Sequence, residues 1–117
     1  MAKLMETERA LGREPRDVHE ENRGYDIESS ILGTGHLLFI EVNGRAPDAR
    51  TVTITRNEIL TGLNKPEEYT LAIVHVDKTA ANTPRYVRRP FQREPDFGVE
   101  SMNYDLEELL ARSEEPA

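Results

Sequence analysis

The sequence predicts one α/β domain whose elements run in the order helix, three strands, helix and strand, followed by an extra C-terminal helix. Three patterns lead to this prediction. Apolar side chains recur at helical spacing in residues 2–11. Residues 51–55 alternate threonine with Val52 and Ile54, as in a strand with one buried face. Residues 69–76 are almost continuously apolar, as in a central strand, so we expect a mixed sheet flanked by helices.

The first helix places Leu4, Glu8 and Leu11 on one inward face, and Gly12 is expected to end it. Residues 13–23 are charged and contain a proline. We therefore predict a loop there, with a short extended piece around its only valine, Val18.

Two capping boxes mark the starts of the later helices. Thr55 and Glu58 have the spacing that caps the second helix, and Asp105 and Glu108 repeat it at the C-terminal helix. We read Glu58 as a cap and nothing more. Residues 113–117 are expected to fray.

The remaining strands follow from turn signals. A strand begins at residues 25–27 and is joined by the turn at residues 33–35 to the strongest strand, residues 37–42. Residues 77–84 are predicted to be a polar loop. Residues 86–88 are predicted to be one more strand.

The chain has 117 residues, which suits a single domain spanning residues 1–117. It has no cysteine, which excludes disulfides, zinc–cysteine sites and thiol nucleophiles. A cysteine-free chain suits a reducing cytoplasm, where we expect the protein to be located. The longest apolar run, residues 37–40, is too short to cross a membrane, and no signal peptide is predicted.

The net charge of −7 does not favour binding to nucleic-acid phosphates, but the basic residues are concentrated. Residues 78–93 hold five basic residues and no acidic one, whereas residues 6–28 and 94–115 each hold eight carboxylates. The five are Lys78, Arg85, Arg88, Arg89 and Arg93. They form either a solvated loop and edge strand or a nucleic-acid-binding stretch centred on Arg88 and Arg89.

One strand carries the residues with the clearest chemistry. Phe39, Glu41 and Asn43 share a face, because side chains alternate along a strand. A carboxylate in so apolar a strand needs a metal, a positive group or a hydrogen-bond donor. Asp26 lies on the strand expected to pair with it. Two such carboxylates repel each other unless a cation or a shared proton relieves them, and Mg²⁺ is the usual cation for such a pair.

Simpler roles remain open for these residues. Asp26 could shape a turn or accept a hydrogen bond from a backbone N–H. Glu41 could form a structural ion pair with Arg45 or Arg56. We expect the strand to break at residues 44–48, so Arg45 shares the face of Glu41 only if the strand continues through Gly44.

Three strings resemble the NO VEIN C-terminal domain family. They are Asn-Arg-Gly-Tyr-Asp-Ile-Glu-Ser at residues 22–29, Phe-Ile-Glu-Val-Asn-Gly-Arg at residues 39–45 and Thr-Ile-Thr-Arg-Asn-Glu at residues 53–58. The resemblance runs from about residue 8 to about residue 110. This domain of unknown function often lies at the C-terminal end of large helicase-like or ATPase proteins. It is similar to PD-(D/E)xK nucleases, which implies a restriction-endonuclease-like core and a larger helicase-like or ATPase protein as its partner or remainder.

The resemblance also implies roles for single residues. Asp26 and the glutamate of the E-x-K motif, Glu41, would hold Mg²⁺. Asn43 stands where an active nuclease has its lysine. A glutamate from the first helix often joins such sites, and Glu8 is the candidate, with Glu6 as the fallback.

The replacement by Asn43 bears on catalysis. Asparagine can form hydrogen bonds but carries no charge and cannot act as an acid. Loss of one group that stabilises the transition state typically costs about 10²–10³ in rate. Arg45 or Arg56 would have to supply the missing charge. Arg56 and Asn57, at the start of the second helix, are the polar residues that such nucleases place near nucleic acid.

Three functions follow as hypotheses. The first is a nuclease-fold accessory domain with a degenerate active site that binds DNA or a partner protein in a nucleic-acid-processing or defence system. The second is an active Mg²⁺-dependent endonuclease that tolerates Asn43. The third is a protein-interaction or dimerisation module, with a homodimer formed through the edge strand near Tyr86.

Overall fold

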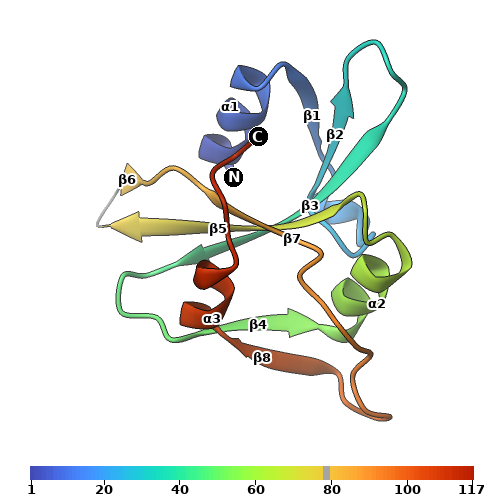
Figure 1. Cartoon of the computed structure of the whole chain (residues 1–117), viewed down its shortest axis with the longest axis vertical. Coiled ribbons are helices and arrows are strands. Elements are labelled where there is room, and N and C mark those ends of the chain that lie inside the picture. Colours follow the sequence, from blue (N-terminus) through green and yellow to red (C-terminus); the bar gives the residue numbers. More distant parts are fainter. Residues whose placement is uncertain (78–79) are drawn as a thin grey trace.

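The computed structural model describes residues 1–77 and 80–117 and is built around one mixed sheet (Figure 1). The strands of this sheet are β1 (Arg13–Asp17), β2 (Ile27–Ile31), β3 (Leu37–Arg45), β5 (Tyr69–Asp77), β6 (Ala80–Ala81) and β7 (Arg85–Arg88). Their order is β1-β2-β3-β5, and both β6 and β7 pair with β5. Lys78, part of both the predicted loop and the basic stretch, lies outside the described residues.

The pairing of β3 with β5 is parallel, and the other pairs are antiparallel. A parallel pair needs a crossover, and here the chain passes through β4 (Thr51–Thr55) and α2 (Arg56–Asn64). Strand β4 pairs with β8 (Ser101–Asp105) in a separate two-stranded sheet. The other helices are α1 (Ala2–Ala10), the short 3₁₀ helix η1 (His19–Glu21) and α3 (Leu106–Ala111). No helix in the described part is long and apolar enough to span a membrane.

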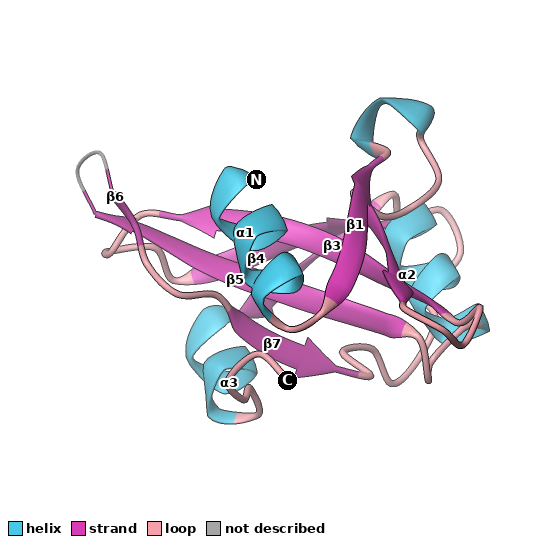
Figure 2. Ribbon diagram, turned by 90° about the horizontal axis from the view of Figure 1, so that it is seen from above, coloured by secondary structure: helices cyan, strands magenta, loops and turns pink. Residues whose placement is uncertain are grey.

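The sheet is covered on both faces, and the three α-helices lie apart from one another around it (Figure 2). On the α1 face, Leu4 packs with sheet residues that include Ile40 and Tyr86. On the α2 face, Leu71 and Val87 pack with side chains from α2, α3 and the β4–β8 sheet. The buried side chains named here therefore form two separate clusters, one on each face of the sheet.

The predicted helices and strands occur in the predicted order, but the strand membership of the main sheet differs from the prediction. Residues 13–17, expected to be a loop, form β1, and residues 51–55 form a strand outside the main sheet. The sequence Arg-Glu-Pro-Arg-Asp has no apolar alternation. Its strand character comes from pairing with β2, from Arg13↔Ile31 to Asp17↔Ile27. The unpredicted strand β8 depends in the same way on pairing with β4.

The predicted break at Gly44 is wrong, because β3 continues to Arg45. The parallel ladder with β5 extends through Gly44↔Val74 and Arg45↔His75. Continuous pairing keeps the side-chain alternation in phase. Arg45 therefore lies on the face of Glu41 and Asn43.

The helix starts agree largely with the prediction. Thr55 and Glu58 form both hydrogen bonds of the capping box, at 2.8 and 3.2 Å. Asp105 caps α3 by accepting from the backbone N–H of Glu107 at 2.9 Å. The reciprocal contact predicted for Glu108 does not occur among the described residues.

Candidate active site

The candidate site begins where β2 and β3 diverge. Asp26 directly precedes β2, and its backbone N–H donates to the carbonyl of Ile40 at 2.9 Å. Its carboxylate Oδ2 accepts from the backbone N–H of Val42 at 2.8 Å. Val42 lies past the end of the β2–β3 ladder, so Asp26 satisfies an amide that would otherwise lack a strand partner. The backbone role foreseen for Asp26 is thus observed, and its Oδ1 remains available.

The loop carrying Asp26 is held against two other elements through Gly24. A Cβ at Gly24 would lie 2.3 Å from Oγ1 of Thr61 in α2, and the residue has a φ of +86°. The hydroxyl of Tyr69 in β5 donates to the carbonyl of Gly24 at 2.9 Å. This close approach requires glycine and fixes the position of Asp26.

Glu41 is buried on the α2 face, in one row with Leu71 and Val87. Its side chain is only 6% exposed, and its Oε1 has no hydrogen-bond partner among the described residues. Burial and the neighbouring carboxylates of Glu58 and Asp26 raise the pKa of Glu41 to about 10. Without a cation, Glu41 is therefore protonated at neutral pH.

Glu58 is the residue of this group that sequence reasoning did not place in the site. One oxygen accepts from the backbone N–H of Thr55 at 2.8 Å, as the capping box requires. The same side chain lies close enough to Glu41 to raise its pKa. The cap was visible in the spacing from Thr55 to Glu58. The proximity to Glu41 was not, because α2 approaches β3 only through the tertiary fold.

These carboxylates line a small pocket of about 240 Å³. Its other lining residues include Asn57 of α2, and His19 and Arg23 from η1 and the loop after it. A hydrogen bond to Asp17 raises the pKa of His19, which favours a positive charge at one wall. A larger surface hollow of about 570 Å³ between the β3–β4 loop and β8 contains none of the predicted residues.

Asn43 is also buried, two residues after Glu41 on the same face of β3, and its side chain is hydrogen-bonded to Arg45. Nη2 of Arg45 donates to Oδ1 of Asn43 at 2.8 Å. The guanidinium also donates to the carbonyls of Gly44 at 2.7 Å and Thr51 at 3.1 Å. The alternative ion pair between Glu41 and Arg45 is not observed among the described residues. The positive charge of Arg45 instead lies beside Asn43.

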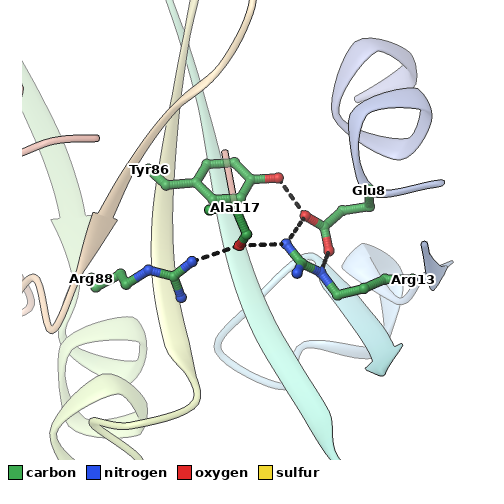
Figure 3. Close-up of polar contacts among 5 residues, drawn as sticks. All are labelled: Glu8, Arg13, Tyr86, Arg88 and Ala117. Carbon is green, nitrogen blue, oxygen red and sulfur yellow. Dashed lines mark hydrogen bonds and ion pairs between the residues drawn. The ribbon is translucent and has the colours of Figure 1, made fainter. Parts of the chain in front are cut away.

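The structure does not bring Glu8 to this group. Glu8 is fully buried on the α1 face, where Arg13 donates to its two oxygens at 2.7 and 2.9 Å and the hydroxyl of Tyr86 donates at 2.5 Å (Figure 3). Burial acts to raise the pKa of Glu8, but the hydrogen bonds from Arg13 and Tyr86 outweigh it and hold the pKa below its ordinary value. The fallback, Glu6, is exposed. Helical periodicity correctly turned Glu8 inward, but toward the other side of the sheet from Glu41.

The remaining predicted basic residues also point elsewhere. Arg56 donates to the carbonyls of Asp96 and Val99, each at 3.2 Å. Arg88 pairs with Glu114 at 3.0 Å, and Arg89 pairs with Glu67. The two residues at the centre of the expected nucleic-acid-binding stretch are thus paired with acidic residues of their own chain.

The carboxylate oxygens of the pocket are of the chemical type that binds a hard divalent cation such as Mg²⁺. Asp26 and Glu58 each use one carboxylate oxygen on a backbone N–H, and Glu41 has an oxygen without a partner. Each side chain therefore retains an oxygen of the type that Mg²⁺ prefers. In the described part of the chain, no three histidine, aspartate or glutamate side chains form a ready metal cage.

Comparison with known proteins places the chain in a family. A family model described as "Protein NO VEIN, C-terminal" matches residues 1–87. The chain belongs to the NO VEIN C-terminal family. The matched residues of this NO VEIN C-terminal domain include Asp26, Glu41 and Asn43. Strand β8 and helix α3 lie beyond the match, which is shorter than the resemblance suggested.

A solved structure supports the fold of this NO VEIN C-terminal domain. The chain is similar to Archaeoglobus fulgidus Hjc, described as a Holliday junction resolvase from an archaeal hyperthermophile, with a TM-score of 0.66 and 15% identity. The match covers 100% of this chain and 96% of that one. A search of curated proteins found no match. At this identity the similarity establishes the fold alone, which confirms the predicted restriction-endonuclease-like class and leaves activity to be argued from the site.

Proposed function

We propose that the chain is a nuclease-fold accessory domain that binds DNA at the Asp26–Glu41 pocket and cleaves it poorly or not at all. The observation that supports this proposal is the state of Asn43. Its side chain is buried beside Glu41 and accepts a hydrogen bond from Arg45. Efficient cleavage would need a mobile, protonated amine at this position, where the chain has a neutral amide.

The residues of the pocket have complementary tasks in this proposal. Asp26 and Glu41, with Glu58 beside them, would hold Mg²⁺, and Glu41 would give up its proton on binding it. The bound cation would polarise a phosphate oxygen. Arg45 would add a fixed positive charge, and Asn57 would offer hydrogen bonds from the N-terminus of α2.

Asp26→Asn is expected to weaken Mg²⁺-dependent DNA binding by at least about tenfold, because it removes one carboxylate of the pocket. Asparagine keeps an oxygen that can accept from Val42, so the fold should persist. Fluorescence anisotropy at low salt with duplex, single-stranded and four-way branched DNA measures the effect. Asp48→Asn, on the exposed loop after β3, is the matched control. Failure of the wild type to bind any of these DNAs at micromolar concentration would end the proposal.

A second candidate function, slow Mg²⁺-dependent endonuclease activity, is favoured by the position of Arg45. Its guanidinium supplies charge beside Asn43, although it cannot donate a proton at neutral pH. Measurable nicking that disappears in both Arg45→Gln and Glu41→Ala would support this function.

Asn43→Lys is expected to raise cleavage by about 10²–10³, because it restores a charged group beside the reacting phosphate. Nicking of supercoiled plasmid with Mg²⁺ or Mn²⁺ measures the rate, and Asn43→Lys combined with Glu41→Ala provides the blank. If Asn43→Lys cleaves the plasmid with neither metal, the absence of a lysine at this position is not the reason for weak or absent cleavage.

A further inference from the structure

The last residues of the chain lie along the edge strand β7 rather than fraying. Tyr86 and Glu114 exchange two backbone hydrogen bonds of 2.9 Å each, forming an antiparallel bridge. Figure 1 shows the chain passing from α3 across β7 to the side of α1. The predicted fraying of residues 113–117 is wrong, because this segment pairs with a strand that would otherwise have an open edge. The edge considered for a homodimer is covered, at Tyr86, by the chain itself.

Two arginines of β7 hold this segment from opposite faces of the strand. Arg85 donates to Oγ of Ser113 at 3.1 Å and to its carbonyl at 3.0 Å. Arg88 donates to Oε1 of Glu114 at 3.0 Å. Both arginines belong to the basic stretch of the sequence, residues 78–93, which contains no acidic residue. Residues 113–117 supply the oxygen atoms that accept their hydrogen bonds.

A third arginine completes the arrangement at Ala117. Nη2 of Arg88 and Nη2 of Arg13 converge on the backbone oxygen of Ala117 at 2.7 and 3.1 Å (Figure 3). Arg13 is fixed behind this point by its two hydrogen bonds to the buried Glu8. Two rigidly presented guanidinium groups around one oxygen form a strong anion-binding arrangement, and such groups match phosphate well.

We infer that Ser113–Ala117 is an internal mask over a second DNA-binding surface made of Arg13, Arg85 and Arg88. The inference rests on the DNA-binding part of the proposed function and concerns a different edge of the domain from the carboxylate pocket. The oxygens of the mask occupy the positions that backbone phosphates of DNA would take. With the mask displaced, the ion pair that these three arginines retain within the described part of the chain is that of Arg13 with the buried Glu8.

The contacts that hold the mask in place are weak enough for DNA to displace it. The Arg88–Glu114 pair is 39% and 56% exposed, so water and salt weaken it. The backbone pairing is one isolated bridge rather than a ladder. DNA presents many phosphates, releases counterions when arginines bind them, and can compete with so short a segment.

Glu114→Gln is expected to bind a short DNA duplex about 2- to 5-fold more tightly than the wild type, because it weakens the mask by one surface ion pair. Its affinity should also fall more steeply with salt. Glu94→Gln, an equal charge change at an exposed loop position, is the matched control and should leave the affinity close to that of the wild type. Arg88→Gln added to Glu114→Gln should remove the gain.

Amide exchange gives a second readout on the unaltered protein. The Glu114 amide donates to Tyr86, so it should exchange slowly in the free protein and faster at saturating duplex. The inference of a mask would be overturned if Glu114→Gln and Glu94→Gln bound DNA equally well. It would also be overturned if the Glu114 amide stayed protected from exchange at saturating duplex. If the wild type still shows binding that depends on Asp26 and Mg²⁺, the proposed function survives that result. If no variant binds DNA, both ideas fall.

Discussion

Arg13→Met is expected to lower the free energy of unfolding by about 3–5 kcal/mol. The change removes every hydrogen bond from Arg13 to Glu8 and leaves a fully buried carboxylate that still accepts from the hydroxyl of Tyr86 but has lost its countercharge. An ionised group without a countercharge in an apolar interior is far more costly than the loss of one contact. Urea unfolding at pH 7, followed by circular dichroism, measures the loss.

Two further variants separate this cause from a general effect on β1. Arg16→Met alters the same strand, but the Arg16 side chain is 63% exposed and pairs with Glu28 at the surface. We expect it to cost at most about 1 kcal/mol. Adding Glu8→Gln to Arg13→Met should restore much of the stability, because no buried charge then remains. A loss below 1 kcal/mol for Arg13→Met alone would contradict a charged Glu8.

Glu41→Gln is expected to raise the free energy of unfolding by about 2–3 kcal/mol at pH 7. In the folded protein the pKa of Glu41 is raised from 4.5 to about 10. Between these values the folded state holds a proton that the unfolded chain releases, so stability falls as the pH rises through this window. Glutamine cannot ionise, so it removes this loss.

Unfolding curves collected from pH 5 to pH 9 test both the sign and the size of the effect. The gain from Glu41→Gln should increase with pH and become small near pH 5, where the unfolded carboxyl also begins to hold its proton. Asp48→Asn, at an exposed position, should follow the wild type throughout. A gain that does not vary with pH would mean that the benefit comes from packing rather than from ionisation. Mg²⁺ should stabilise the wild type but not Glu41→Gln.

The candidate site was predictable where it depends on one strand. Alternation along β3 placed Glu41 and Asn43 on one face without any knowledge of the sheet. The turn before β3 brought Asp26 to the neighbouring strand. The uncertainty at Gly44 was resolved only by the ladder with β5, a partner that lies far along the chain.

Contacts that depend on how separate helices and strands pack together were not predictable from local sequence patterns. Periodicity indicates that Glu8 faces an interior, but it cannot say which of the two faces of the sheet that interior lies against. Glu58 was recognised as a cap because capping is local, whereas its approach to Glu41 follows from how α2 lies on the sheet. The pairing of Glu114 with Tyr86 likewise joins a predicted strand to a polar segment whose own sequence carries no strand pattern.

The buried network on the α1 face also has a consequence for the order of folding. Tyr86 lies 78 positions after Glu8, and Ala117 lies 104 positions after Arg13. Closing contacts over such separations is slow, because most of the chain must be ordered first. On the ribosome, the first helix is made early, yet its buried glutamate gains its tyrosine partner only after β7 has emerged. We therefore expect α1 to dock late, after the elements that follow it in the chain.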